Sequence, residues 1–122
     1  MKKYKEGKYT VEENSYGSKQ WFLNGKRHRE DGPAVERSDG SKYWHLNGEL
    51  HRENGPAIEY SNGTKQWFLN GECHREDGPA VEYSEGTKYW YLNGERTTPE
   101  VVLSQLPKEQ RMHALFNLDE WA

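Results

Sequence analysis

The sequence predicts a mostly β fold: a single-layer, twisted run of β-hairpin repeats that ends in a short C-terminal α-helical cap. The first observation is a 23-residue repeat, since the stretch from Gly17 to Glu36 returns at Gly40 and Gly63 and, shortened, at Gly86. The second is a pair of glycine-centred turn signals in every copy, with strand-length segments between them. The third is a helix-start pattern directly after the last copy. Such periods indicate stacked supersecondary units.

Composition indicates a thin structure with a few large buried side chains. Of the 122 residues, 32% are apolar and 30% are charged, yet aromatics reach 13%. That aromatic share is too high for a disordered polar tract. Each Trp or Tyr buries about 150–250 Å², so a regular row of them replaces a broad aliphatic core. One domain is expected at this length.

The net charge and the cysteine content limit the classes of partner and the cellular compartment that are to be expected. The formal net charge is −3, whereas nucleic acid and anionic membrane select a basic face, so neither is expected as a partner. Cys73 is the single cysteine and cannot form an internal disulfide, which favours a reducing cytosol. The sequence shows no apolar leader and no long apolar run. We therefore expect a soluble cytoplasmic protein.

Residues 1–16 are expected to form an N-terminal edge strand. Tyr9 and Val11 alternate with polar residues, as in a half-buried strand. The lysines before them would discourage pairing with another sheet. A lysine-rich arm for nucleic acid is the less favoured alternative, because glutamates dilute the positive charge.

Residues 17–96 are expected to form four hairpin repeats, the last of them truncated. Each copy contains an Asn-Gly pair, which tolerates positive φ at both central residues of a two-residue hairpin turn. A second glycine turn and, in three copies, a Gly-Pro break separate the strands, which predicts a β-meander with two main strands per repeat. Residues 20–36 and 66–82 differ at only two positions, which indicates duplication of a 46-residue pair.

Strand alternation assigns the side chains of each repeat to two faces. One face carries Trp and Leu in all four copies, and we expect it to be the scaffold. Trp44 and Trp67, in the middle, are expected to be covered by a repeat on each side. The other face varies between copies and forms the candidate partner-binding stripe. Its residues are Phe22, Tyr43, His45, Phe68, Tyr89 and Tyr91.

The repeat stops at Thr97-Thr98-Pro99-Glu100, which is typical of a helix start with a threonine cap, an early proline and an acid in the first turn. A second helical stretch is expected from Lys108 to Asn117. The last unit of an array needs a cover, so residues 97–122 are predicted to form a helical cap, with Pro99 to Trp121 as the covering segment. A partner-binding amphipathic helix is the alternative. The apolar residues of the two stretches are Val101, Val102, Leu106, Met112, Leu115 and Phe116.

The copies read G-[ST]-K-x-W-x-L-N-G four times and H-R-E-[DN]-G-P-A-[VI]-E three times. They resemble MORN repeats, which share the 23-residue period, the central Asn-Gly and a following His. Here the stretch before Asn-Gly is shorter, and His-Arg-Glu-Asp-Gly-Pro replaces His-Gly. This form is similar to repeats of bacteriophage and giant-virus proteins. The resemblance covers residues 17–96 and implies a curved run of β-hairpins that serves as a scaffold or interaction module. Lipid binding is not expected, because no basic face accompanies the aromatics.

The His-Arg-Glu triplets are the main candidate for chemistry. A metal site needs ligands within about 2.0–2.2 Å of one ion, whereas strands about 4.8 Å apart place equivalent histidines roughly 10 Å apart. No metal and no cofactor are therefore expected, and we predict hydrogen bonds and ion pairs that hold successive hairpins in register. An anion-binding row is the alternative for Arg29, Arg52 and Arg75, although neighbouring acids favour internal pairing.

The expected function is binding without catalysis. The sequence contains no nucleophile–base pattern, no phosphate-binding loop and no carboxylate pair outside the repeats. An aromatic stripe left bare on a thin sheet exceeds the apolar patch of an ordinary monomer, so we expect it to bind another protein or a second copy of the chain. Given the phage-like repeats, a phage-encoded inhibitor of a host defence protein is the concrete hypothesis. A small-ligand or nucleotide-binding module and a viral structural protein are the alternatives.

Overall fold

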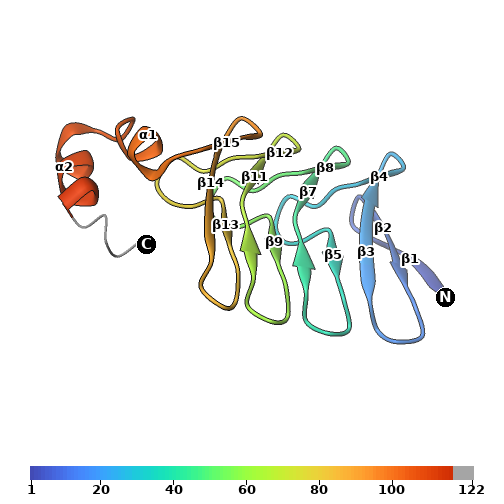
Figure 1. Cartoon of the computed structure of the whole chain (residues 1–122). Helices are drawn as coiled ribbons and strands as arrows, with labels where there is room; N and C mark the ends of the chain where they lie inside the picture. The colour runs from blue at the N-terminus through green and yellow to red at the C-terminus, as the bar shows by residue number, and fades with distance from the viewer. Residues whose placement is uncertain (117–122) are drawn as a thin grey trace.

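The computed structural model describes residues 1–116 and shows an antiparallel β-meander followed by two short helices (Figure 1). Eleven strands form one sheet whose order follows the chain, and two short hairpins form separate two-stranded sheets. The N-terminus lies at one end of the array and the helices lie at the other (Figure 1). The predicted fold class, hairpin repeats in a meander with a short helical cap, is confirmed.

The N-terminal segment forms a hairpin, where the sequence predicted one edge strand. β1 (Lys2–Glu6) pairs antiparallel with β2 (Tyr9–Glu13), and Gly7 between them has a φ of 59°. Glycine adopts this left-handed conformation without a steric penalty, so one glycine suffices for the turn. β1 is exposed along its whole length and forms the outer edge of the sheet, so its lysines oppose edge-to-edge pairing as predicted.

In each repeat, one extended segment pairs with two different neighbours. β3 (Lys19–Leu23) pairs with β5 (Val35–Glu36) through its first half and with β4 (Lys26–Arg27) through its second half. In the next two repeats the segment is interrupted at the tryptophan, and each half is a separate strand. The remaining strands are β6 (Lys42–Tyr43), β7 (His45–Leu46), β8 (Glu49–Leu50), β9 (Ile58–Glu59), β10 (Lys65–Gln66), β11 (Phe68–Leu69), β12 (Glu72–Cys73), β13 (Val81–Glu82), β14 (Lys88–Leu92) and β15 (Glu95–Thr97).

The Asn-Gly turns have the predicted backbone conformation. The asparagines have φ values of 50, 51, 52 and 53°, and the glycine after each also has positive φ. This pair of left-handed residues matches the twist of a two-residue hairpin. The four asparagines are Asn24, Asn47, Asn70 and Asn93.

The turns at the other ends of the strands, away from the Asn-Gly turns, link each repeat to the next. The Asp39 carboxylate accepts a hydrogen bond from the Ser41 amide at 2.8 Å, and the Ser41 hydroxyl accepts the amide of Ser61, one repeat later, at 3.0 Å. Equivalent bonds join Ser38 to Ser18 at 2.8 Å and Ser84 to Thr64 at 3.1 Å. The Ser or Thr after each turn glycine therefore fixes the spacing between neighbouring repeats.

Charged residues alternate in sign across the sheet. On the Trp-Leu face, each strand of the meander places a Lys or a Glu opposite its neighbour, and opposite charges in such cross-strand pairs are favourable. The ladder runs Lys19, Glu36, Lys42, Glu59, Lys65, Glu82 and Lys88.

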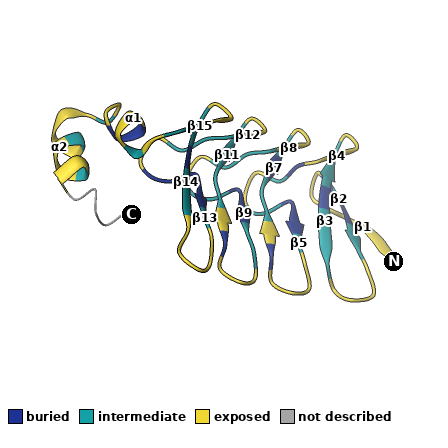
Figure 2. Cartoon of the chain, viewed as in Figure 1, coloured by how far each residue is buried: buried dark blue, intermediate teal, exposed yellow. Residues whose placement is uncertain are grey.

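The tryptophan row is buried at its ends and half-buried in its middle, although the sequence predicted that a repeat on each side covers the two middle tryptophans. Trp21 is 3% exposed beside Tyr9 and Val11 of the N-terminal hairpin, and Trp90 is 4% exposed beneath the first helix. Trp44 and Trp67 are only half-buried. In the middle of the array the neighbouring repeats lie beside each tryptophan and leave it partly open, whereas the N-terminal hairpin, in the same sheet, packs against Trp21 and α1 packs against Trp90 (Figure 2).

The helical cap begins as predicted. α1 (Pro99–Leu103) starts after Thr98, whose hydroxyl accepts the Val101 amide at 3.3 Å. Val102 and Leu103 are fully buried against Trp90, whereas Val101 faces solvent. Neither helix is long and apolar enough to cross a membrane within the described residues.

The second helix covers less of the array than the sequence predicted. α2 (Lys108–Phe116) has no buried residue. Its predicted apolar side is exposed at Met112, Leu115 and Phe116, while Ala114 packs against the cluster around Trp90, so α1 provides most of the cover of the last repeat. Asn117, which the sequence assigned to the second helix, and Trp121, which it assigned to the cap, lie outside the described residues.

Candidate protein-binding grooves

The His-Arg-Glu-[Asp/Asn]-Gly-Pro segments fold back over the tryptophan row. The guanidinium groups of Arg29, Arg52 and Arg75 each lie 3.9 Å from the ring centre of the tryptophan in the same repeat. A guanidinium over an indole face is a favourable cation–π contact, worth about 0.5–2 kcal/mol according to its exposure. Each arginine therefore forms a lid over its tryptophan.

The conserved spacing between arginine and glycine within the repeats has a steric reason. A Cβ built on Gly32, Gly55 or Gly78 would lie 3.1, 2.9 or 2.7 Å from the guanidinium carbon of the arginine three residues earlier. The guanidinium is thus held between a tryptophan ring and a glycine backbone. A side chain at the glycine would displace it, which explains the glycine in all three copies.

Each arginine is also paired inside the chain. Nη1 of Arg52 donates to the Pro56 carbonyl at 3.1 Å and to Glu59 at 3.2 Å, and Nη1 of Arg75 donates to Pro79 and Glu82 at 3.0 and 2.8 Å. Arg29 lies 3.8 Å from Glu36 and 3.4 Å from Asp31. The predicted internal pairing is confirmed. The alternative of an anion-binding row gains no support, because these donors point into the chain.

The histidines hold successive hairpins in register, as predicted. Nδ1 of His28, His51 and His74 accepts the amide of the turn asparagine in the following repeat, at 2.8, 2.9 and 2.8 Å. An accepting Nδ1 leaves the proton on Nε2. Nε2 lies 2.9 Å from Glu30 in the first copy and 3.2 Å from Glu76 in the third. The histidine is therefore a link between repeats.

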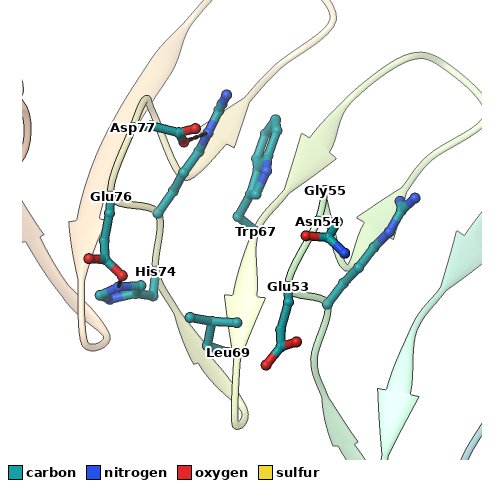
Figure 3. A pocket seen from close by; sticks show the side chains of 10 residues that line it. Glu53, Asn54, Gly55, Trp67, Leu69, His74, Glu76 and Asp77 are labelled. Carbon is teal, nitrogen blue, oxygen red and sulfur yellow. Dashed lines mark hydrogen bonds and ion pairs between the residues drawn. The ribbon is translucent and has the colours of Figure 1, made fainter. Parts of the chain in front are cut away.

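Successive back-folded segments enclose two grooves of the same construction. The first, of about 600 Å³, has Trp44 and Leu46 on its floor. The second, of about 530 Å³, has Trp67 and Leu69 on its floor, with Glu53 and Asn54 on one side and His74 and Glu76 on the other (Figure 3). Two strands separate the grooves, so they repeat at about 10 Å.

The charge that the grooves present to solvent is negative. Each groove is lined by two arginines and three carboxylates. The arginine side chains are only 18–29% exposed, whereas the five lining carboxylates are 53–79% exposed. Hydrogen bonds from Lys8 and His28 lower the pKa of Glu30, so it is ionised at neutral pH. These carboxylates are Glu30, Asp31, Glu53, Glu76 and Asp77.

The predicted partner-binding stripe is not a bare surface. Phe22, Tyr43, Phe68, Tyr89 and Tyr91 are all half-buried, and His45 is only 8% exposed. In the sheet register, the short strands that carry Val35, Ile58 and Val81 lie between the aromatic strands. Tyr60 and Tyr83 pack edge-on against Tyr43 and Tyr89, with ring centres 6.0 and 5.8 Å apart. The expectation of an exposed stripe is therefore wrong, because interleaved aliphatic residues and edge-on tyrosine pairs cover much of it.

Sequence reasoning missed the groove face as a candidate site. It assigned all four tryptophans to a covered scaffold, although the middle two form groove floors. The sequence feature that could have indicated the groove face is the Arg-x-x-Gly-Pro pattern, which requires a loop that returns close to its own repeat.

Cys73, the single thiol, is half-buried, and burial raises its pKa to about 11, so it is protonated at neutral pH.

No protein-family model, curated protein or solved structure matches the chain. The resemblance to MORN repeats therefore stays a prediction. Within residues 1–116, no three His, Cys, Asp or Glu side chains form a group suited to a metal ion.

Proposed function

We propose that the chain is a non-catalytic module that binds another protein through the two grooves of its Trp-Leu face. The observation that carries this proposal is the repetition of one half-exposed apolar floor with one carboxylate rim at a spacing of about 10 Å. Tryptophan is the residue type most enriched where interfaces concentrate their binding energy. Half-buried Trp44 and Trp67 therefore provide anchors that the covered end tryptophans do not.

The partner that fits these grooves is an extended, basic segment of a protein. In a polyproline II conformation three residues make one turn and span about 9 Å, so basic side chains three residues apart project from the same side and reach equivalent carboxylates in the two grooves. Apolar residues between them lie over the Trp-Leu floors. Charge complementarity of this kind raises the association rate and selects the partner. Under the phage-type resemblance, a host protein that carries such a segment is the partner to test first.

Affinity capture with matched charge variants tests the proposal. The groove variant is Glu53→Lys with Glu76→Lys, and the control is Glu49→Lys with Glu95→Lys. The control makes the same charge change at exposed turn positions where the first repeat already holds Lys26. We expect the wild type and the control to capture the same protein from a host lysate, with binding that weakens as salt rises, and the groove variant to lose it.

Two follow-up measurements define the interface. A synthetic extended peptide from the captured protein, with its lysines and arginines intact, is expected to bind the wild type by calorimetry, and its alanine-substituted version is not. Capture that survives in the groove variant but is lost in Phe68→Ala and Tyr91→Ala would contradict the proposal. That outcome would place the interface on the aromatic stripe, as the sequence predicted.

A further inference from the structure

A third cavity, of about 320 Å³, lies between the first two repeats on the face opposite the grooves. Gln20, Tyr43 and His45 line it, and strand alternation directs them away from the tryptophans at positions 21 and 44. Val35 and Ile58 add apolar surface from the strands on either side of Tyr43. The volume lies at the lower end of the range of small-molecule sites.

The charge in this cavity is opposite to that of the grooves. Arg27 and Arg37 line it, and no acidic residue does, although the chain as a whole carries a net charge of −3. Nε of Arg27 donates to the Gln20 side chain at 2.8 Å, and Arg37 lies 5.2 Å from the Tyr43 ring centre. Neither arginine forms an ion pair within the described part of the chain, in contrast to the three lid arginines. Two guanidinium groups without a close ion pair therefore line one cavity, with the charge of Arg37 also acting on Asp39, whose pKa is lowered by the Ser41 amide and by that charge.

His45 adds an unsatisfied polar group to the wall. Its side chain is almost fully buried, and Nδ1 is the single buried side-chain nitrogen or oxygen in residues 1–116 without a hydrogen-bond partner. Burial, followed by the charge of Arg27, lowers the pKa of His45, so the ring is neutral at neutral pH. A buried polar group without a hydrogen-bond partner destabilises the folded state. Such a group in a folded protein requires an explanation, and a ligand is one.

The other repeats show that none of these three polar residues is needed for the fold. The position of Arg27 is Leu50, Cys73 or Arg96 in the other copies, that of Arg37 is Tyr60 or Tyr83, and that of His45 is Phe22, Phe68 or Tyr91. The same backbone is thus built with aromatic or aliphatic residues elsewhere. The combination of two arginines and a buried histidine occurs at this one junction between repeats.

We propose that this cavity binds a small organic anion, with Arg27 and Arg37 holding its carboxylate or phosphate and its carbon body lying against Val35, Ile58 and the Tyr43 ring. His45, after rotation of its ring, supplies a hydrogen bond to the ligand. Two guanidinium groups match the planar oxygens of a carboxylate or the oxygens of a phosphate. The site is independent of the grooves, which lie on the other face.

Thermal shift and calorimetry with four probes test the proposal. Adenosine monophosphate combines a ring with a phosphate, benzoate combines a ring with a carboxylate, adenosine lacks the charge, and inorganic phosphate lacks the ring. We expect one of the two ring-bearing anions to raise the melting temperature and to bind with millimolar or better affinity. The anion that binds identifies the headgroup, and the neutral and ring-free probes are expected to bind at least about tenfold more weakly.

The decisive variant is Arg27→Leu with Arg37→Tyr and His45→Phe, which installs residues that other repeats hold at the same positions. It is expected to keep its melting temperature and to lose anion binding by at least about tenfold. Arg27→Gln with Arg37→Gln, at two exposed positions, provides a second test with the core unchanged. Lys42→Gln with Lys65→Gln removes the same charge from the other face and should leave binding intact.

Two results would overturn the proposal: no binding of either ring-bearing anion at millimolar concentration, or equal binding by the wild type and the arginine variants. The groove variant Glu53→Lys with Glu76→Lys is expected to bind the anion normally. A failure of the anion site is therefore distinguishable from a failure of the protein-binding grooves.

Discussion

The ends and the middle of the tryptophan row use the same repeat in two different ways. At the ends, Trp21 and Trp90 are buried by elements that are not repeats, the N-terminal hairpin and α1. In the middle, Trp44 and Trp67 have the same arginine lid as Trp21 but no terminal element packed against the ring, and they stay half-buried. An identical motif is thus core or surface according to what packs against it. At the tryptophan row, the terminal elements supply hydrophobic burial, whereas the central repeats depend on stacking and hydrogen bonds.

Truncation of an end tryptophan is expected to have the largest effect on stability. Trp90→Ala should lower the free energy of unfolding by about 3–5 kcal/mol, because it empties the contact with Val102 and Leu103. Trp67→Ala should cost less than about 3 kcal/mol, since its ring is already partly solvated. Urea denaturation followed by circular dichroism measures both. Equal losses of unfolding free energy in the two variants would contradict the distinction between buried end tryptophans and half-buried middle tryptophans.

The next largest effect is expected in the cover itself. Leu103 is fully buried against the last repeat, so Leu103→Ala should cost about 2–5 kcal/mol. Leu115→Ala, the same truncation at an exposed position of α2, should stay within about 0.5 kcal/mol. The comparison of their denaturation midpoints shows whether α1 provides most of the cover of the array. A large loss from Leu115→Ala would show that α2 provides a large share of that cover.

A smaller effect is expected where an arginine lid is displaced in the middle of the array. Gly55→Ala places a Cβ 2.9 Å from the guanidinium carbon of Arg52 and should cost about 1–3 kcal/mol. The same substitution should cost much less in an Arg52→Ala background, because the steric conflict is then absent. A double-mutant cycle measures this coupling. If the losses of stability from the two substitutions were additive, the glycine would be needed for a reason other than to leave space for the arginine.

The smallest expected effect concerns one hydrogen bond between central repeats. His51→Ala removes the acceptor of the Asn70 amide and should cost about 1–2 kcal/mol. Hydrogen exchange of that amide is expected to become faster, while the Asn47 amide, bonded to His28, keeps its protection. His51→Asn, which places a side-chain oxygen close to the lost nitrogen, should restore part of the protection. Unchanged exchange at Asn70 would contradict the role of the histidine as a link.

Local features of the fold could be predicted from the sequence. Asn-Gly determines the hairpin turns because both residues tolerate positive φ, and Thr98 with Pro99 marks the start of α1. The internal pairing of the His-Arg-Glu triplets followed from strand spacing. The N-terminal hairpin was missed, because its turn depends on Gly7 with no second signal nearby.

The candidate sites could not be predicted in full, because alternation sorts side chains into faces without showing what covers each face. The stripe is half-buried since Val35 and its equivalents lie between the aromatic residues in space, although they are distant in sequence. The grooves depend on the path of the loop after each histidine. The cavity at His45 required knowledge of which strands of the first two repeats meet there, which periodicity alone does not give.

The bonds from each histidine and each turn hydroxyl reach only the next repeat, 19 or 20 residues along the chain. Linear arrays coupled in this way gain stability roughly in proportion to their number of units. Their length is therefore adjustable without redesign. Excision of residues 28–73 would join Arg27 to His74 and bring the two covered tryptophans into adjacent repeats. Insertion of the same 46 residues would instead extend the row of grooves and lengthen the partner segment that the protein can span.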